Sequence, residues 1–328
     1  MLSCWVVTDG KAGMDSQCLG LAEALGLTPV MKRVALRKFW RAVTPYIRLG
    51  GTAQFATDGD ALAPPWPDIL IASGRQSVAA ALWVKKRSRG RTIAIQVQNP
   101  GIARRRFDLI IAPEHDRLAG PNVISTRGAL HRVTPAMLSR EGAAWSPRFS
   151  SLPRPYIAVL MGGSNPAYRL GRAEAAVLAA KLKTCARTVG GSLLITPSRR
   201  TGQEAIAALA AGVRSAPFFV WDMQGENPYF ALLALADYIV VTCDSVNMVS
   251  EAASTGKPVY VEMLPGGSAK SARFLDRLRA DGIIRNFSGA LMPYDYPPLD
   301  DMTKAVERIR SLIGAWKQPG SDSVSTIP

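Results

Sequence analysis

The chain has 328 residues, of which 48% are hydrophobic and 20% are charged, a composition typical of a soluble globular protein with two domains. Charged or turn residues interrupt every apolar run that could cross a bilayer, and the first residues lack a secretory leader, so we expect a cytoplasmic protein. The formal net charge of +15 indicates anionic partners. No nucleic-acid motif accompanies it, so nucleotides, phosphorylated substrates or an anionic membrane surface are favoured over nucleic acid.

In the first half of the chain, short apolar runs bounded by turn residues alternate with helical patterns, which is typical of βαβ units and a parallel sheet. We expect strands at residues 4–8, 30–36, 69–72, 92–97, 109–112 and 123–125. Helices are expected between them at residues 16–25 and 76–86. Residues 139–154 are polar and interrupted by proline, and they indicate a linker.

A second series of strands and helices begins after this linker. Its expected strands are residues 156–161, 192–196, 218–221, 238–242 and 258–262. Its expected helices are residues 172–187, 203–211 and 300–313, with a short one beginning near Val246. The last dozen residues are expected to be a frayed tail. The fold class predicted is α/β, with two Rossmann-like, doubly wound domains of residues 1–149 and 150–328, and the closing helix could pack back on the first domain.

The cysteine and histidine content does not indicate a metal site. Only two histidines, His115 and His131, are present in the chain. The four cysteines share no metal-binding spacing, and we expect them to be reduced and buried: Cys4, Cys18, Cys185 and Cys243.

Three loops that follow strands of the second half are suited to anions, and ligands of open α/β sheets bind at such loops. The first is Gly162-Gly163-Ser164-Asn165, whose backbone amides and hydroxyl could cradle an anion, although a tight turn is an equally good interpretation. The second contains Arg199 and Arg200, which could pair with phosphate oxygens or could simply be solvated at the start of a helix.

The third loop begins a helix. Ser245 is placed to cap it, which leaves amides near Val246 and the positive end of the dipole for a diphosphate. Asn247 and Glu251 share one face of this helix, so the carboxylate could reach ribose hydroxyls. A surface glutamate on a short amphipathic helix is the alternative.

The segment "ADYIVVTCDSVNMVSEAASTGKPVYVE" resembles the donor-nucleotide segment of GT-B glycosyltransferases. Over nearly its whole length the chain resembles the family named for the plant mitochondrial fission (elongated mitochondria) protein, which has many bacterial members. That family is similar to GT-B glycosyltransferases, and its founding plant member is known as an adaptor in organelle division. The matching segments are "TDGKAGMDSQCLGLAEALG", "ASGRQS", "QNP", "MGGSN", "TPSRRT", "ENPYFALLALAD" and "TCDSVNMVSEAASTGKPV".

The resemblance implies a GT-B-like fold with a cleft between the two domains, and it implies roles for individual residues. Donor nucleotide contacts would come from Gly162, Gly163, Ser164, Asn165, Arg199, Arg200, Ser245, Val246, Asn247 and Glu251. Asn227 and Tyr229 would lie near the base or sugar, unless Asn227 only caps a helix. Acceptor or phosphate contacts would come from Lys11, Gly13, Arg75, Gln98 and Asn99.

The catalytic base would come from the first domain, where it removes a proton from the attacking hydroxyl. Asp15 and Asp9 are the candidates, and His131 is the weaker one. Asp15 could instead interact with the dipole of the first helix.

These features predict a metal-independent, inverting glycosyltransferase that needs no cofactor besides its substrate, a sugar nucleotide with UDP as the expected carrier. The acceptor would be an anionic cell-envelope glycan or a lipid-linked molecule at the inner face of the membrane. A non-catalytic adaptor that recruits a partner at a membrane, and a nucleotide-sugar epimerase, are the alternatives.

Overall fold

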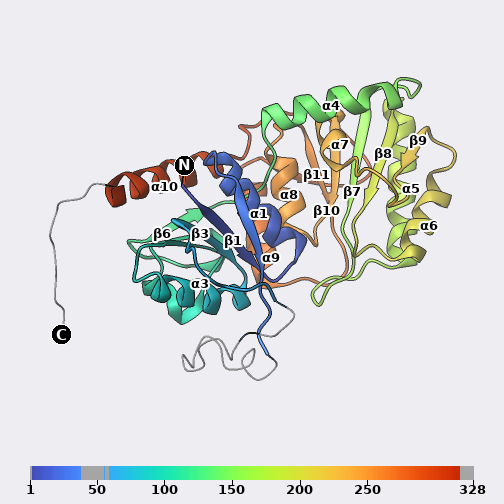
Figure 1. Ribbon diagram of the computed structural model, residues 1–328. Helices are drawn as coiled ribbons and strands as arrows, with labels where there is room; N and C mark the ends of the chain where they lie inside the picture. The colour runs from blue at the N-terminus through green and yellow to red at the C-terminus, as the bar shows by residue number, and fades with distance from the viewer. Residues whose placement is uncertain (1, 38–54, 56–58, 318–328) are drawn as a thin grey trace.

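The computed structural model describes residues 2–37, 55 and 59–317, and it contains two parallel six-stranded sheets with helices packed on them (Figure 1). The first sheet has the order β2-β1-β3-β4-β5-β6. Its strands are β1 (Cys4–Thr8), β2 (Pro29–Arg33), β3 (Ile69–Ser73), β4 (Ile93–Val97), β5 (Leu109–Pro113) and β6 (Val123–Thr126). The helices of this half are α1 (Ala12–Ala24), α3 (Arg75–Arg87), η2 (Gly101–Arg106) and η3 (Glu114–Asp116).

The second sheet has the order β12-β11-β10-β7-β8-β9. Its strands are β7 (Tyr156–Met161), β8 (Ser192–Pro197), β9 (Phe218–Val220), β10 (Tyr238–Thr242), β11 (Val259–Glu262) and β12 (Ile284–Asn286). The helices that belong to it in sequence are α5 (Arg172–Val189), α6 (Gln203–Val213), α7 (Tyr229–Leu235), α8 (Val246–Ala253) and α9 (Ala269–Ala280). In both sheets the central strands are buried on both faces, as expected where helices cover a parallel sheet.

The prediction of a linker over residues 139–154 is wrong for most of that range, because helix α4 (Pro135–Phe149) runs through it. Thr134 caps this helix by accepting a hydrogen bond from the Met137 amide at 3.1 Å. Trp145 and Phe149 lie one turn apart and are buried in the apolar core of the second sheet. Burial of these two aromatic rings stabilises the helix despite Pro147, which lacks an amide hydrogen near the helix end.

The closing helix α10 (Met302–Lys317) packs on the other half of the molecule. Its residues Ala305, Val306 and Ile309 are buried in the core beneath the first sheet, together with residues of α1. The chain therefore passes from the first sheet to the second and returns (Figure 1). The division between residues 149 and 150 remains a prediction.

All four cysteines are free and buried, as predicted. Within the described residues there is no cluster of side chains suited to a metal ion. In the same part of the chain, no helix is long and apolar enough to span a membrane. The predicted tail at the carboxyl terminus lies outside the described residues, apart from the end of α10.

Candidate functional site

The glycine turn after β7 is bound to a carboxylate of the chain itself. The Gly163 amide donates to Asp244 at 3.0 Å, and the Arg200 guanidinium forms an ion pair with the same oxygen at 2.8 Å. The hydroxyl of Thr242 donates to the other carboxylate oxygen at 2.7 Å and accepts from the Gly162 amide at 2.8 Å. Gly162 has no room for a side chain, because a Cβ atom there would collide with the Asp244 carboxylate.

Ser164 and Asn165 stabilise the loop that follows this turn. The Ser164 hydroxyl accepts from the Leu170 amide at 3.0 Å, and the Asn165 side chain accepts from the amides of Ala167 and Tyr168. The Asn165 amide group also donates to the Asp244 carbonyl at 3.3 Å. Ser164 and Asn165, which were both predicted to contact the donor, therefore bind groups of the chain itself.

Helix α8 begins as predicted at Val246, and Ser245 caps it by accepting from the Met248 amide at 3.4 Å. The exposed Arg199, which follows β8, has no ion pair or hydrogen bond to the described part of the chain. Arg199 is thus the predicted donor contact least engaged with other residues.

Asn247 and Glu251 of α8 face helix α1 of the other half of the molecule. The Gln17 amide donates to Asn247 at 2.9 Å, and the Ser16 hydroxyl donates to Glu251 at 3.4 Å. Gly13 packs against the Asn247 side chain so closely that a Cβ atom would overlap it. These contacts join the two halves at the amino ends of α1 and α8.

Glu251 is buried, and both of its carboxylate oxygens have hydrogen-bond partners. The Tyr229 hydroxyl donates to the second oxygen at 2.6 Å, so the structure brings these two predicted contacts together. Burial raises the pKa of Glu251 to about 7, although the hydrogen bonds from Tyr229 and Ser16 act to lower it. Asn227 accepts from the Tyr229 amide at 3.0 Å, which matches its interpretation as a helix-start residue.

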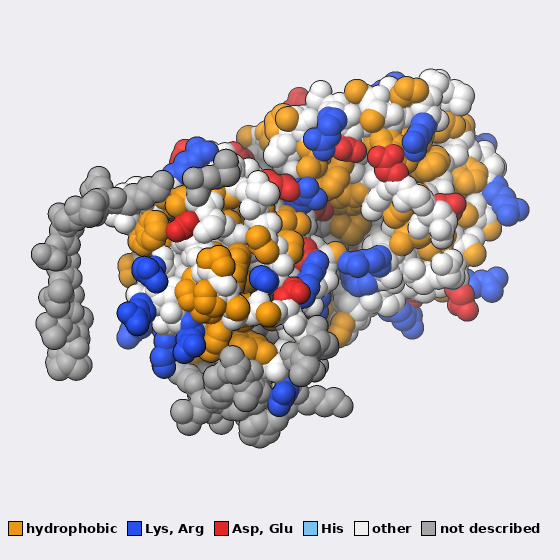
Figure 2. Space-filling view, viewed as in Figure 1, with side chains coloured by type: hydrophobic (Ala, Val, Ile, Leu, Met, Phe, Trp, Pro, Cys, Tyr) orange, Lys and Arg blue, Asp and Glu red, His pale blue; other side chains and the backbone are white. Residues whose placement is uncertain are grey.

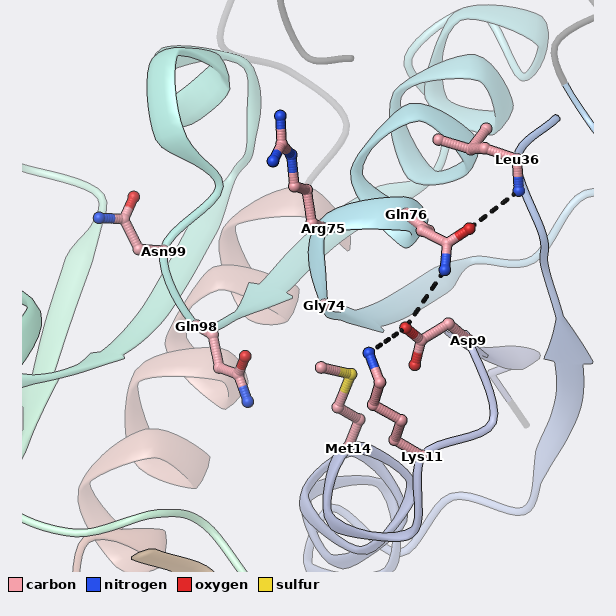
Figure 3. A pocket seen from close by; sticks show the side chains of 9 residues that line it. All are labelled: Asp9, Lys11, Met14, Leu36, Gly74, Arg75, Gln76, Gln98 and Asn99. Atoms are coloured by element: carbon pink, nitrogen blue, oxygen red, sulfur yellow. Dashed lines mark hydrogen bonds and ion pairs between the residues drawn. The ribbon is translucent and has the colours of Figure 1, made fainter. Parts of the chain in front are cut away.

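A cavity of about 400 Å³ lies at the carboxyl ends of β1, β3 and β4 in the first sheet (Figure 3). Its lining is mostly polar and includes four of the predicted acceptor-side residues. The lining residues are Asp9, Lys11, Met14, Leu36, Gly74, Arg75, Gln76, Gln98 and Asn99.

Asp9 is the carboxylate of this cavity, and its side chain is only 5% exposed. One oxygen accepts from Lys11 at 2.8 Å and from Gln76 at 3.4 Å. The other oxygen, Oδ1, is buried and has no hydrogen-bond partner. A buried carboxylate oxygen without a partner is costly, and a hydrogen-bond donor that reached it would offset that cost.

Asp15 is held differently. Its two oxygens accept hydrogen bonds from Thr8 at 2.5 Å and from Arg33 at 2.6 Å, and the second contact is an ion pair. Both oxygens are therefore engaged, which makes Asp15 a poorer proton acceptor than Asp9 in this arrangement. His131 is buried and packs its backbone against Gly20 of α1, and burial lowers the pKa of its side chain to about 4.

The far wall of the cavity has an unusual backbone. Gln98 has a φ of 75°, a left-handed conformation that is uncommon for a residue with a side chain. Figure 3 shows its side chain pointing toward Met14 and Lys11, whereas Asn99 points to the other side of the strand end. The Asn99 side chain accepts from the Gly101 amide at 2.8 Å.

Sequence reasoning missed two kinds of residue at these sites. Asp244 was not recognised, although it directly precedes the predicted cap Ser245 in the segment that resembles a donor site. Gln76 and Gln17 were also missed, because their roles depend on contacts with Asp9 and with the other half of the molecule. Only the position of Asp244 at the end of a strand could have indicated it.

Two parallel sheets of Rossmann-like topology, with strand-end loops from both halves near one another, define a GT-B-like fold. Figure 2 shows that the surface is hollowed between the two lobes and bordered there by charged side chains. A UDP-GlcNAc 2-epimerase from Methanocaldococcus jannaschii shares this fold, with 11% identity, coverage of 96% of this chain and 100% of that chain, and a TM-score of 0.55. Spinosyn forosaminyltransferase SpnP also shares it, with 15% identity, coverage of 97% and 100%, and a TM-score of 0.51.

The chain belongs to the family described as Mitochondrial fission ELM1, which it matches over residues 12–313. It is 33% identical to the mitochondrial fission protein ELM1 of Arabidopsis thaliana, and the similarity covers 94% of this chain and 91% of that protein. The family resemblance expected from the sequence is confirmed.

Proposed function

We propose that the chain is a metal-independent, inverting glycosyltransferase that uses a UDP-linked sugar and an acceptor hydroxyl bound in the cavity of the first sheet. The observation that carries the proposal is the Asp9 carboxylate, which lines that cavity and has one oxygen without a hydrogen-bond partner in the described chain. A carboxylate in this position can accept the proton of an attacking hydroxyl. Lys11, bound to the other oxygen, keeps the carboxylate in place.

The position of the cavity also supports the proposal. Lys11 and Met14 line it, and Gly13, between them in sequence, contacts Asn247 of α8. Acceptor and donor regions would thus lie on two sides of the first turn of α1. The amides at the start of α8 and the guanidinium of Arg199 would bind the diphosphate of the donor and stabilise the charge that develops as it leaves.

The acceptor in this proposal is a cell-envelope glycan or a lipid-linked molecule at the inner face of the membrane. The net charge of +15 supports an anionic acceptor or membrane surface.

A second candidate function is a non-catalytic adaptor with a GT-B-like fold. The bonds of Asp244 to Gly163 and Arg200 favour it, because they engage two predicted phosphate-binding groups with the chain's own carboxylate. Kinship with a mitochondrial fission protein is consistent with this alternative.

Thermal unfolding of the purified protein distinguishes the two functions. Tm is measured with UDP, GDP, CDP and CMP, and with their sugar conjugates, in the absence of added metal. A ligand that binds only the folded state at a hundred times its Kd adds about 2.7 kcal/mol to the free energy of unfolding. We expect a selective increase in Tm with UDP and its conjugates.

Two variants sharpen this experiment. Arg199→Gln should reduce the UDP-dependent shift, whereas Asp9→Asn should retain the shift and lose sugar transfer to an added acceptor. Absence of any shift at millimolar nucleotide would contradict the transferase and leave the adaptor as the better account.

A further inference from the structure

The Asp244 carboxylate occupies a site built from groups that bind anions. We call this site the anion cradle and define it by the Gly163 amide, the Thr242 hydroxyl and the Arg200 guanidinium. These groups lie 3.0, 2.7 and 2.8 Å from the carboxylate oxygens. The Asp244 side chain is 0% exposed, so it makes no contact with solvent.

The three groups of the cradle come from three different strand ends. Gly163 follows β7, Arg200 follows β8, and Thr242 ends β10. A backbone amide, a hydroxyl and a guanidinium that converge in this way also form binding sites for phosphate and carboxylate ligands. The cradle is therefore a complete anion site whose occupant is covalently part of the chain.

We propose that the Asp244 carboxylate permanently occupies this cradle and thereby determines which groups can bind there. With Asp244 in place, the phosphates of a ligand cannot bind to the glycine turn or to Arg200. Arg200 neutralises Asp244 and is not available as a phosphate-binding group. One part of the proposal rests on the proposed function: the phosphates of the sugar-nucleotide donor bind to Arg199 and to the start of α8.

The neighbouring residue gives this assignment a geometric basis. Ser245 turns its side chain into α8 as the cap, while Asp244 turns back toward β7 and β8. Adjacent residues thus point in different directions, and only the Asp244 side chain enters the cradle. Without Arg200, the buried Asp244 charge would repel an anion bound at α8.

The test is chemical rescue of Asp244→Ala by formate, which can replace the missing carboxylate. Removing the buried carboxylate leaves the Gly163 amide and the Thr242 hydroxyl without their acceptor and should lower Tm by several degrees. Sodium formate should then raise the Tm of Asp244→Ala in a saturable manner, well beyond its effect on the unsubstituted chain. Sodium chloride at equal ionic strength gives the background.

Asp237→Ala is the matched control. Asp237 also pairs with an arginine, Arg154, and accepts from the Tyr156 amide, but its side chain is 36% exposed. Its removal leaves an open surface rather than an enclosed cradle, so formate should not rescue it. The double variant Asp244→Ala, Arg200→Ala should likewise show no rescue, because the principal cation is missing.

The proposal is overturned if formate stabilises Asp244→Ala no more than it stabilises the unsubstituted chain. Should Asp244→Ala not fold in sodium chloride, it is refolded in sodium formate, and a recovery no greater than in sodium chloride overturns the proposal. Nucleotide binding is not needed for this measurement, so its result is independent of the proposed transferase. If nucleotide binds, the double variant Asp244→Ala, Arg200→Ala, which removes both charges of the pair, should leave its affinity within about threefold, and a loss as large as that of Arg199→Gln would also overturn the proposal.

Discussion

Glu251 makes the stability of the molecule depend on pH in a direction that is unusual for a carboxylate. Burial raises its pKa to about 7 in the folded chain, above the ordinary value of 4.5. Between these two values the folded state binds more protons than the unfolded state, so the free energy of unfolding must fall as pH rises. The contribution is fully present below pH 4.5 and is lost as the pH passes 7.

We therefore expect Glu251→Gln to flatten the pH profile of stability. Each pKa unit corresponds to about 1.4 kcal/mol, so the unsubstituted chain should lose about 2 kcal/mol more than the variant between pH 5 and pH 8. Urea unfolding at both pH values measures this difference. The glutamine oxygen can still accept from the Tyr229 hydroxyl, and its amide nitrogen can donate to the Ser16 hydroxyl, so the fold should be preserved.

Comparison with the variant is essential, because two buried histidines act in the opposite direction. Burial lowers the pKa of His115 and of His131 to about 4, so their contribution to stability increases as pH rises from 4 toward 6.5. Both histidines are present in both proteins, and their effect cancels in the difference. Parallel pH profiles for the two proteins would show that Glu251 is not buried as described.

Single residues were predictable from sequence where their role depends on local chain geometry. Ser245 could be assigned as a cap because the preference of serine for helix starts is local, and the structure confirms the cap. Asp9 and Asp15 could not be distinguished, because the difference lies in Arg33, which engages Asp15 from β2. Asp244 was missed because its partners come from two other strand ends.

At the scale of elements, α1 connects the first sheet to both the cavity and α8, and its glycines show how tightly it is packed. A Cβ atom on Gly20 would collide with the backbone carbonyl of His131, which cannot move without shifting its loop. A Cβ atom on Gly13 would meet only the end of the Asn247 side chain, which can rotate.

These two glycines predict different costs for the same substitution. Alanine is favoured over glycine inside a helix by about 1 kcal/mol, and overpacking typically costs 1–3 kcal/mol. We expect Gly20→Ala to destabilise the chain by about 2 kcal/mol and Gly13→Ala by less than about 1 kcal/mol. Denaturant unfolding of both variants measures the costs, and equal values would contradict the packing described for α1.

Most strands and the longer helices were predicted within a few residues, because buried parallel strands and amphipathic helices have distinct apolar patterns. Helix α1 begins at Ala12, four residues before its predicted start, since Lys11 offers no side-chain cap that would mark the boundary. The helices α4 and α9 were not predicted, and α7 was considered only in the alternative in which Asn227 caps a helix. In α4, Pro147 and the polar residues around it concealed the burial of Trp145 and Phe149 against the second sheet.

At the scale of the whole molecule, the two halves also contact each other through residues that do not line the cavity. Asp116 of η3 pairs with Lys270 of α9 at 2.6 Å, and Arg273 donates to the His115 carbonyl at 3.1 Å. Further contacts link Gly128 to Asp301 and Ala129 to Ser250. Contacts of this kind, between residues more than a hundred positions apart, cannot be inferred from local sequence patterns.

The net positive charge is concentrated in part on a surface of the first half, which we call the α3–η2 surface and define by Lys86, Arg87, Arg104 and Arg105. All four residues are exposed. Lys85 brings the two segments together by donating to the Arg106 carbonyl at 3.2 Å and pairing with Asp108 at 2.7 Å. Ile102, on the same short helix as Arg104, is 56% exposed.

If the chain acts at an anionic membrane, this surface should contribute to its attachment. Each basic residue near such a membrane contributes about 1 kcal/mol, so replacing all four by alanine should weaken binding to phosphatidylglycerol vesicles on the order of a thousandfold. Vesicle cosedimentation at low salt measures the effect, and phosphatidylcholine vesicles should bind neither protein.

A control variant removes the same charge from the second half of the molecule, by replacing Arg172, Lys183, Arg187 and Arg214 with alanine. Attraction to a charged membrane falls off within a Debye length, about 10 Å at 0.1 M salt, so charge acts only where it faces the surface. The control should therefore bind vesicles almost as well as the unsubstituted chain. Equal losses in the two variants would mean that net charge alone governs attachment and that the α3–η2 surface has no orienting role.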